Sequence, residues 1–262
     1  LQERETEDLA AKILNEKSLF VALEEFLTAW CANTDQPTVL LLDEVDALIG
    51  DTLISLLRQL RAGYPKRPTH FPQTIILCGV RDIKDYRIHS SAEKAIITGG
   101  SAFNIKAASL RLGDFTRTEV FTLLHQHTEE TGQVFEADAV DRIWEYTQGQ
   151  PWLVNALAYE VCFKMEAGRE RTRPVTADQI FQAKERLIQE RVTHLDQLAD
   201  KLREPRVRRI IEPMMAGSNL ENMNPDDIRY VVDLGLCRLD PSGSLVAANP
   251  IYREVMPREL AF

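Results

Sequence analysis

An aspartate and a glutamate stand side by side at the end of an apolar run, in the stretch TVLLLDEVDALIG from Thr38 to Gly50. An unbroken apolar run of this length predicts a strand that is buried on both faces, inside a parallel sheet. Open α/β sheets bind ligands at the carboxyl ends of such strands. There Asp43 would hold Mg²⁺, directly or through water, and Glu44 would orient and polarise an attacking water molecule. The alternative is that both carboxylates only cap the next helix, because acidic residues suit a helix N-terminus.

The sequence lacks the loop that normally accompanies such a pair. Two carboxylates after a buried strand form the Walker B pattern of P-loop NTPases, which hold the nucleotide phosphates in a G-x-x-x-x-G-K-[ST] loop. That loop occurs nowhere in the 262 residues, and the chain begins at Leu1 without a methionine. We therefore expect this chain to be the C-terminal part of a longer protein, or one whose first part was removed. The missing piece would hold the P-loop strand, the P-loop and its helix.

Composition limits the classes of protein that the chain can belong to. It is 44% hydrophobic and 27% charged, which is ordinary for a globular protein. No apolar run approaches the roughly 18 residues of a membrane span, and no signal peptide is present, so we expect a cytoplasmic protein without a membrane partner. The four cysteines are scattered, which predicts neither a zinc site nor a disulfide framework. A net charge of -9 argues against coating nucleic acid, though not against one local basic patch.

Residues 1–113 predict an α/β region around the carboxylate pair. Apolar residues recur at helical spacing from Glu7 to Asn33, and the strand that leads to Asp43 follows. The elements expected after it are a helix from Leu48 to Ala62, a buried strand from Gln73 to Gly79, a loop with short helical pieces over 81–100, and a third strand from Phe103 to Leu112. A parallel sheet covered by helices is the fold class that this order predicts.

The remainder of the chain reads differently. Residues 114–203 predict a small helical bundle, with capping boxes that begin at Thr116 and Thr176 and a helix that begins at Pro151. Residues 204–262 predict a helix from Val207 to Ala216, a helix from Pro225 to Gly235 with Asn224 as its N-cap, and a β-hairpin whose turn is Asp240 to Ser244. Two helices followed by a hairpin are typical of a winged helix-turn-helix.

Three motifs in this order give the chain a family likeness. It resembles the STAND branch of the AAA+ ATPases, and more closely bacterial AAA-like proteins with the same motifs. LLLDEVD is similar to the Walker B strand, IILCGVRD to the sensor 1 strand that ends in an arginine, here Arg81, and TQGQPWLVNAL to the G-x-P motif of the lid, here Gly149-Gln150-Pro151. The resemblance implies part of a P-loop NTPase sheet at 1–113, an all-α lid at 114–203 and a winged helix at 204–262. It also implies ATP and Mg²⁺ as cofactors.

The resemblance gives two further positions a role. The guanidinium of Arg81 would reach the γ-phosphate, which it can bind with two hydrogen bonds. Pro151 would present a rigid apolar ring to the adenine, at the helix start that Gly149 precedes. Each has a plain alternative. Arg81 could be a surface arginine that pairs with Asp82 or Asp85, and glycine with proline also makes an ordinary helix junction.

Two functions from different classes remain after these considerations. The first is a nucleotide-dependent switch, in which ATP holds the sheet domain, the lid and the winged helix closed; ATP hydrolysis is expected only with the missing P-loop present. The second is a catalytically silent interaction or DNA-binding module. A basic cluster from Lys201 to Arg209 favours DNA contact, but Asp226, Asp227 and Asp233 on the expected recognition helix oppose it. Self-association or a protein partner, through the lid or winged helix, fits either function.

Overall fold

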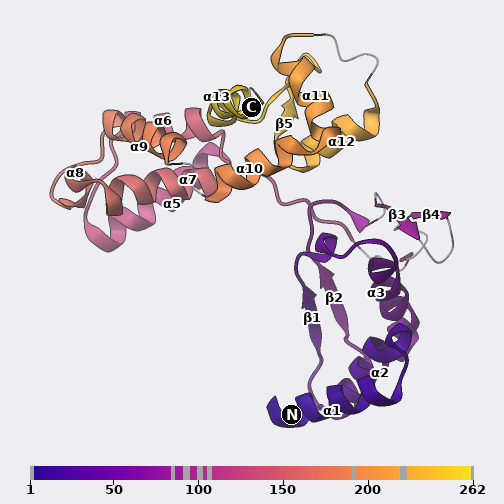
Figure 1. The fold of residues 1–262 in the computed structure, drawn as a ribbon. Coiled ribbons are helices and arrows are strands. Elements are labelled where there is room, and N and C mark those ends of the chain that lie inside the picture. The colour runs from indigo at the N-terminus through magenta and orange to yellow at the C-terminus, as the bar shows by residue number, and fades with distance from the viewer. Residues whose placement is uncertain are drawn as a thin grey trace. The chain divides into compact units, whose positions relative to one another are not determined.

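The computed structural model describes residues 3–83, 86–90, 95–98, 103–104, 108–190, 193–218 and 223–260. It is a mostly helical α/β chain with a small parallel sheet (Figure 1). The chain divides into two compact units, Leu1–Arg111 and Leu112–Phe262, and each is described by itself below. Within the described residues, no helix is long and apolar enough to cross a membrane.

Two helices begin the first unit, where the sequence suggested one long helical stretch. They are α1 (Glu3–Glu16) and α2 (Leu19–Ala32). Ser18 separates them because its backbone is extended and its side chain accepts a hydrogen bond from the N–H of Phe20, as an N-cap does. The second helix carries Leu27, which lies in the core beneath the sheet.

The sheet of this unit contains β1 (Val39–Leu42) and β2 (Thr74–Leu77), which run parallel with Val39 opposite Thr74 and Leu42 opposite Leu77. The connection between them contains the short helix η1 (Val45–Ala47), the helix α3 (Gly50–Gly63) and the short helix η2 (Tyr64–Lys66). One face of the sheet packs on α2 and α3. The residues in that core are Leu40, Leu42, Ile75 and Leu77 of the strands with Leu27, Leu60 and Phe71.

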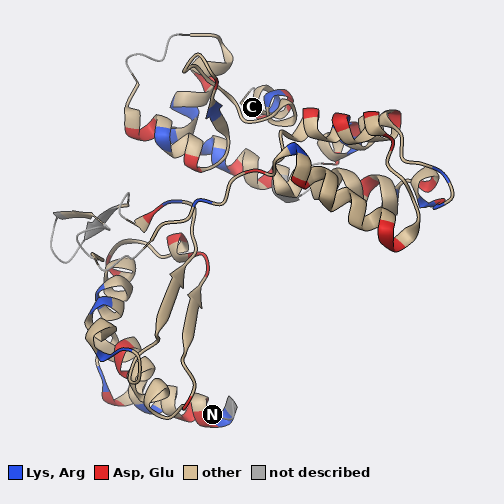
Figure 2. Cartoon of the chain, turned by 180° about the vertical axis from the view of Figure 1, so that it is seen from behind, with Lys and Arg blue, Asp and Glu red and all other residues tan. Residues whose placement is uncertain are grey.

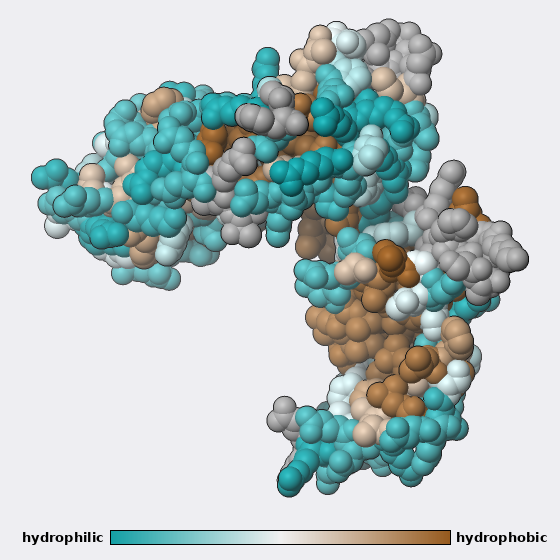
Figure 3. All heavy atoms as spheres, in the orientation of Figure 1, coloured by the Kyte–Doolittle hydropathy of each residue, from teal (hydrophilic) through white to brown (hydrophobic). Residues whose placement is uncertain are grey.

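The expectation that these strands are buried on both faces is wrong. Val39, Leu41 and Ile76 point to the other face and are 52%, 65% and 44% exposed. Figure 3 shows this face as a continuous apolar surface over the sheet. The reason is that the helices of the described residues in this unit cover one side only, whereas the strand sequence is apolar on both sides. We call Val39, Leu41 and Ile76 the uncovered sheet face.

Two further expectations for this unit are corrected. Residues 81–100, expected as a loop with helical pieces, contain an antiparallel hairpin of β3 (Arg87–Ser90) and β4 (Ala95–Thr98). The strand expected from Phe103 to Leu112 is absent from its described residues, 103–104 and 108–112, while 105–107 lie outside the described part. Leu110 and Leu112 are exposed, so their alternation with Arg111 does not reflect a buried strand face.

The second unit begins with a group of helices that we call the middle bundle: α5 (Arg117–Thr131), α6 (Ala137–Thr147), α7 (Pro151–Tyr159), the π-helical turn η4 (Glu160–Lys164), α8 (Glu166–Arg169) and α9 (Ala177–Gln189). Both expected capping boxes are confirmed, because Thr116 and Thr176 exchange hydrogen bonds with Glu119 and Gln179. The backbone hydrogen bond and the hydroxyl of Thr116 lower the pKa of Glu119. The helix expected to run from Pro151 to about Ala167 instead ends before the extended residue Met165.

After α10 (Thr193–Arg203), the chain forms what we call the terminal group: α11 (Pro205–Met215), α12 (Pro225–Asp233), β5 (Cys237–Leu239), β6 (Leu245–Ala247) and α13 (Pro250–Leu260). The expected helix, helix and antiparallel hairpin are all present, and Asn224 caps α12 as predicted. In the hairpin turn, Asp240 accepts hydrogen bonds from Ser242 and Ser244, which lower its pKa.

Candidate functional site

The carboxyl ends of β1 and β2 lie at the same edge of the sheet, because the two strands are parallel and in register. Asp43 and Glu44 follow β1 directly, and Cys78 to Asp82 follow β2. Backbone hydrogen bonds fasten the two segments together: the N–H of Cys78 donates to the carbonyl of Leu42 at 2.8 Å, and the N–H of Val45 donates to the carbonyl of Cys78 at 3.1 Å. The residues with expected chemistry in this unit therefore share one fixed edge.

Glu44 has an unusual backbone. Its φ of 51° and ψ of 39° lie in the left-handed region, which costs a non-glycine residue about 1–2 kcal/mol. Its N–H donates to Oδ1 of Asp43 at 2.8 Å, and both side chains are exposed. The capping alternative gains no support here, because the Glu44 side chain makes no cap hydrogen bond to η1 and the N-cap of α3 is Ile49. Strained backbone of this kind is concentrated at functional sites.

The strain at Glu44 can be measured without any ligand. We expect Glu44→Gly to be more stable than Glu44→Ala by about 1 kcal/mol, because glycine adopts a left-handed backbone without a Cβ penalty. Urea unfolding of the first unit, followed by circular dichroism, gives this difference. The control is the same pair of substitutions at the exposed helical residue Glu7, where glycine should be less stable than alanine by about 1 kcal/mol. The same sign at both positions would show that Glu44 is unstrained.

The loop after β2 passes close to the loop after β1. A Cβ on Gly79 would lie 2.9 Å from Oδ1 of Asp46 and 3.2 Å from Cγ2 of Val45, so a glycine permits this approach. Arg81 follows two residues later and is half-buried. Its first suggested surface partner, Asp82, accepts a hydrogen bond from the hydroxyl of Ser109, and its second, Asp85, lies outside the described residues. Sequence reasoning missed Asp46, Gly79 and Ser109, because only three-dimensional proximity connects them with the site.

Gly149 and Pro151 belong to the second unit, at the junction of α6 and α7. Gly149 has a φ of +83°, and a Cβ there would lie 1.9 Å from the carbonyl oxygen of Phe115. Phe115 also donates its N–H to the carbonyl of Gly149 at 2.8 Å. Pro151 occupies the first turn of α7, where Gln150 accepts a hydrogen bond from the N–H of Leu153 at 2.6 Å. These contacts give both residues a structural reason to be present, and their role toward a nucleotide stays a prediction.

The structure thus brings Asp43, Glu44 and Arg81 to one edge, whereas Gly149 and Pro151 lie in another unit. Carboxylate oxygens are suitable ligands for Mg²⁺. Oδ1 of Asp43 accepts the Glu44 N–H, and the Asp43 side chain is exposed, so its carboxylate is accessible to a ligand. Within the described part of the chain, no group of three or more histidine, cysteine, aspartate or glutamate side chains gathers to form a metal cage. The edge can therefore supply one or two ligands to a hydrated ion.

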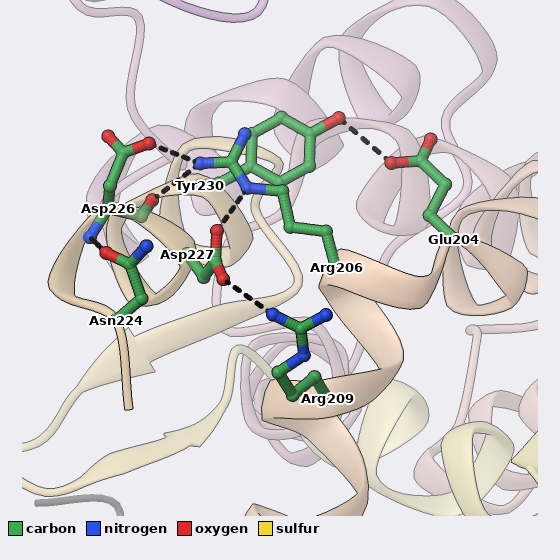
Figure 4. Close-up of polar contacts among 7 residues, drawn as sticks. All are labelled: Glu204, Arg206, Arg209, Asn224, Asp226, Asp227 and Tyr230. Atoms are coloured by element: carbon green, nitrogen blue, oxygen red, sulfur yellow. Dashed lines mark hydrogen bonds and ion pairs between the residues drawn. The ribbon is translucent and has the colours of Figure 1, made fainter. Parts of the chain in front are cut away.

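The basic cluster from Lys201 to Arg209, at the end of α10 and the start of α11, is paired with acidic side chains. Arg206 donates to Asp227 at 2.5 Å and to Asp226 at 2.6 Å, and its guanidinium lies 4.2 Å from the ring centroid of Tyr230 (Figure 4). The remaining four cations of the cluster are each paired as well, in Lys201–Glu204, Arg203–Asp200, Arg208–Glu212 and Arg209–Asp227. Both blue and red segments accordingly occur on α11 and α12 in Figure 2. Phosphate contacts by these cations would require the pairs to open.

We expect Arg206→Ala to lower the free energy of unfolding of the second unit by about 2–3 kcal/mol. The side chain of Asp227 is 9% exposed, and removal of its nearest cation leaves a largely buried charge without full compensation. The control is Arg203→Ala, which removes a pair whose side chains are 73% and 71% exposed and should cost about 0–1 kcal/mol. Equal losses in urea unfolding would show that the Arg206 network is only a surface feature.

The chain was compared with family models, curated proteins and solved structures, and it resembles some of the solved structures. No family model matches the chain, and no curated protein matches it. Among solved structures, it is similar to three variant forms of RuvB from Thermotoga maritima, with 16–17% sequence identity and a TM-score of 0.46. The similarity covers 95% of this chain and 74% of those chains. A likeness of this degree carries no conclusion about function, so the proposal below depends on the residues and contacts of this chain.

Proposed function

We propose that the chain is the Mg²⁺- and γ-phosphate-sensing half of an ATP-dependent switch of the STAND type. The observation that carries the proposal is the shared edge of β1 and β2, where Asp43, Glu44 and Arg81 follow two parallel strands fastened by the Val45 and Cys78 hydrogen bonds. Carboxylates after one strand and a guanidinium after the next match the needs of a hydrated Mg²⁺ and a terminal phosphate. The left-handed backbone of Glu44 supports a role beyond capping.

The residues present could contact the γ-phosphate, its Mg²⁺ and the base, but they do not include a loop for the other phosphates. Asp43 would hold Mg²⁺, which when bound neutralises phosphate charge and orients the terminal phosphate. Glu44 would hold and polarise a water molecule, and Arg81 would bind the γ-phosphate oxygens. Gly149 and Pro151 would contact the base. The G-x-x-x-x-G-K-[ST] loop for the other phosphates is absent from the sequence, so another polypeptide segment would have to supply it.

Arg81→Ala tests the sensing role. In the protein that also carries the phosphate-binding loop, we expect this change to lower ATP affinity about 10-fold or more and to leave ADP affinity within about twofold, because only ATP offers a γ-phosphate. Titration calorimetry with each nucleotide measures both. The control is Arg61→Ala, since Arg61 lies in the last turn of α3, at the end away from the strands' carboxyl edge. Equal losses for ATP and ADP would rule out γ-phosphate sensing by Arg81.

The second candidate is a catalytically silent interaction or DNA-binding module based on the terminal group, whose helix, helix and hairpin order supports a winged helix. All five cations from Lys201 to Arg209 are paired with acidic side chains, and these pairs would have to open before the cations could contact phosphates. For this second candidate, a protein partner is therefore favoured over DNA. If variants of Asp43 and of Glu44 retain the protein's function in full, that function does not depend on ATP hydrolysis. This result would favour the second candidate over the switch.

A further inference from the structure

Helix α13 starts from the terminal group and returns to the middle bundle. It contacts α11 and β6 of its own group, and it also contacts α6 and α9 of the bundle and the connecting helix α10. The chain reaches it through a fixed turn: Ala248 donates its N–H to the carbonyl of Leu236 at 2.9 Å, and the side chain of Asn249 accepts from the N–H of Tyr252 at 2.9 Å. The start of α13 is therefore positioned by the terminal group.

The apolar contacts of α13 are continuous with both groups. One hydrophobic core runs through the unit, and its fully buried members come from the middle bundle (Ile143, Leu157, Ile180), from α11 (Ile210, Ile211) and from α13 (Ile251, Met256). Tyr252 of α13 is buried too, and burial, followed by the charge of Asp114, raises the pKa of its hydroxyl. A core of this kind has no internal boundary at which the two groups could separate without exposing apolar surface.

A partly buried ion pair joins α9 and α13. Nζ of Lys184 on α9 lies 2.8 Å from Oε2 of Glu254 on α13 and 2.6 Å from Oε1 of Glu185. The same nitrogen lies 5.4 Å from the ring centroids of Tyr146 and Phe181. Burial disfavours the charged amine, but the hydrogen bonds and charges of the two glutamates outweigh it, so the pKa of Lys184 is raised. Separation of α13 from α9 would leave this ammonium against aromatic rings without Glu254.

We propose that α13 is a strap that joins the middle bundle to the rest of the terminal group, so that the two groups form one cooperative unit and neither separates or unfolds without the other. The strap itself does not depend on nucleotide. Its consequence for the switch rests on the proposed function. The sequence suggested a lid and a winged helix that separate from each other. With the strap in place, ATP cannot release the terminal group from the bundle and must move the two together. The segment 108–114 at the unit boundary has no regular secondary structure. This segment can accommodate a joint movement of the two groups.

Hydrogen–deuterium exchange of the full chain, without nucleotide, tests the strap. In Ile251→Ala we expect amide protection to fall by at least about 30-fold, and by the same factor in α6 and α9 as in α11 and α12, because one opening exposes all four helices. The matched control is Leu57→Ala, which empties a fully buried site of the first unit and should leave all four helices unchanged. A loss confined to α11 and α12 would overturn the proposal.

A milder variant keeps the test informative if Ile251→Ala does not fold. Lys184→Met keeps most of the side chain's length and removes the ion pair with Glu254, and we expect a smaller decrease in protection that again is equal in α9 and α12. A decrease in α12 alone, or separate exchange rates for the two groups in the unsubstituted chain under mild denaturant, would show that the groups open independently. Since neither experiment contains ATP, a failure of the strap is distinct from a failure of the nucleotide site.

Discussion

Glu44→Gln should lower ATP turnover by about 10²–10⁴-fold in the protein that also carries the phosphate-binding loop, with ATP affinity unchanged. Glutamine keeps the size of the side chain and its hydrogen-bonding reach, but it cannot polarise water as a carboxylate does. The left-handed backbone at this position is equally strained in both forms, so stability should not change. The measurements are steady-state phosphate release and nucleotide titration.

Glu7→Gln is the control for this substitution, because Glu7 is exposed on α1 and distant in sequence from the strand edge. It should leave turnover within about twofold. Turnover in Glu44→Gln that matches the unsubstituted protein would remove Glu44 from the catalytic assignment. If ATP affinity fell in parallel with turnover, the role of Glu44 would be binding rather than water activation.

Gly149→Ala should destabilise the second unit by at least about 3 kcal/mol. Two costs add: a φ of +83° is unfavourable for alanine by about 1–2 kcal/mol, and the new Cβ would lie 1.9 Å from the carbonyl oxygen of Phe115. The clashing atom belongs to the backbone, and the N–H of Phe115 is itself bonded to Gly149, so the neighbour cannot move away cheaply. Urea unfolding measures the loss.

Gly132→Ala separates the two costs. Gly132 also has a left-handed backbone, with a φ of +78°, but no heavy atom beyond its own residue and its two chain neighbours lies within 4 Å of its Cβ position. We expect this control to lose only about 1 kcal/mol. Equal losses at the two glycines would mean that the Phe115 contact is soft, and that the glycine of the G-x-P motif is present for its backbone conformation alone.

Local rules predicted much of the second unit. The capping boxes at Thr116 and Thr176 and the N-cap at Asn224 are signals read from three or four neighbouring residues, and all three are present. Helix α13 was missed although Asn249-Pro250 begins it and buried residues follow at helical spacing, because Pro257 inside the helix argues against a continuous element. Its burial depends on α6, α9 and α10, which no local pattern contains.

The first unit was predicted less well, because the errors concern which segments form strands and which strand faces are covered. An apolar run cannot state whether one or both faces will be covered, and the alternation of Leu110 and Leu112 resembles a strand that the described residues do not form. The candidate site followed from a rule about sheet edges, so Asp43, Glu44 and Arg81 could be placed together in advance. The left-handed backbone of Glu44 and the approach of Gly79 to Asp46 could not, since both arise from the packing of two loops.

The uncovered sheet face makes the stability of the first unit depend on its surroundings. Anything that covers Val39, Leu41 and Ile76 in the folded state and ignores the unfolded chain raises the free energy of unfolding in proportion to the logarithm of its concentration. At a concentration of about 100 times its dissociation constant, the gain is about 2.7 kcal/mol, a large share of what a small domain possesses. The melting temperature of this unit therefore reports binding to the uncovered sheet face as well as the stability of the fold. A melting curve recorded without the species that covers the sheet will understate how stable the unit becomes when the sheet is covered.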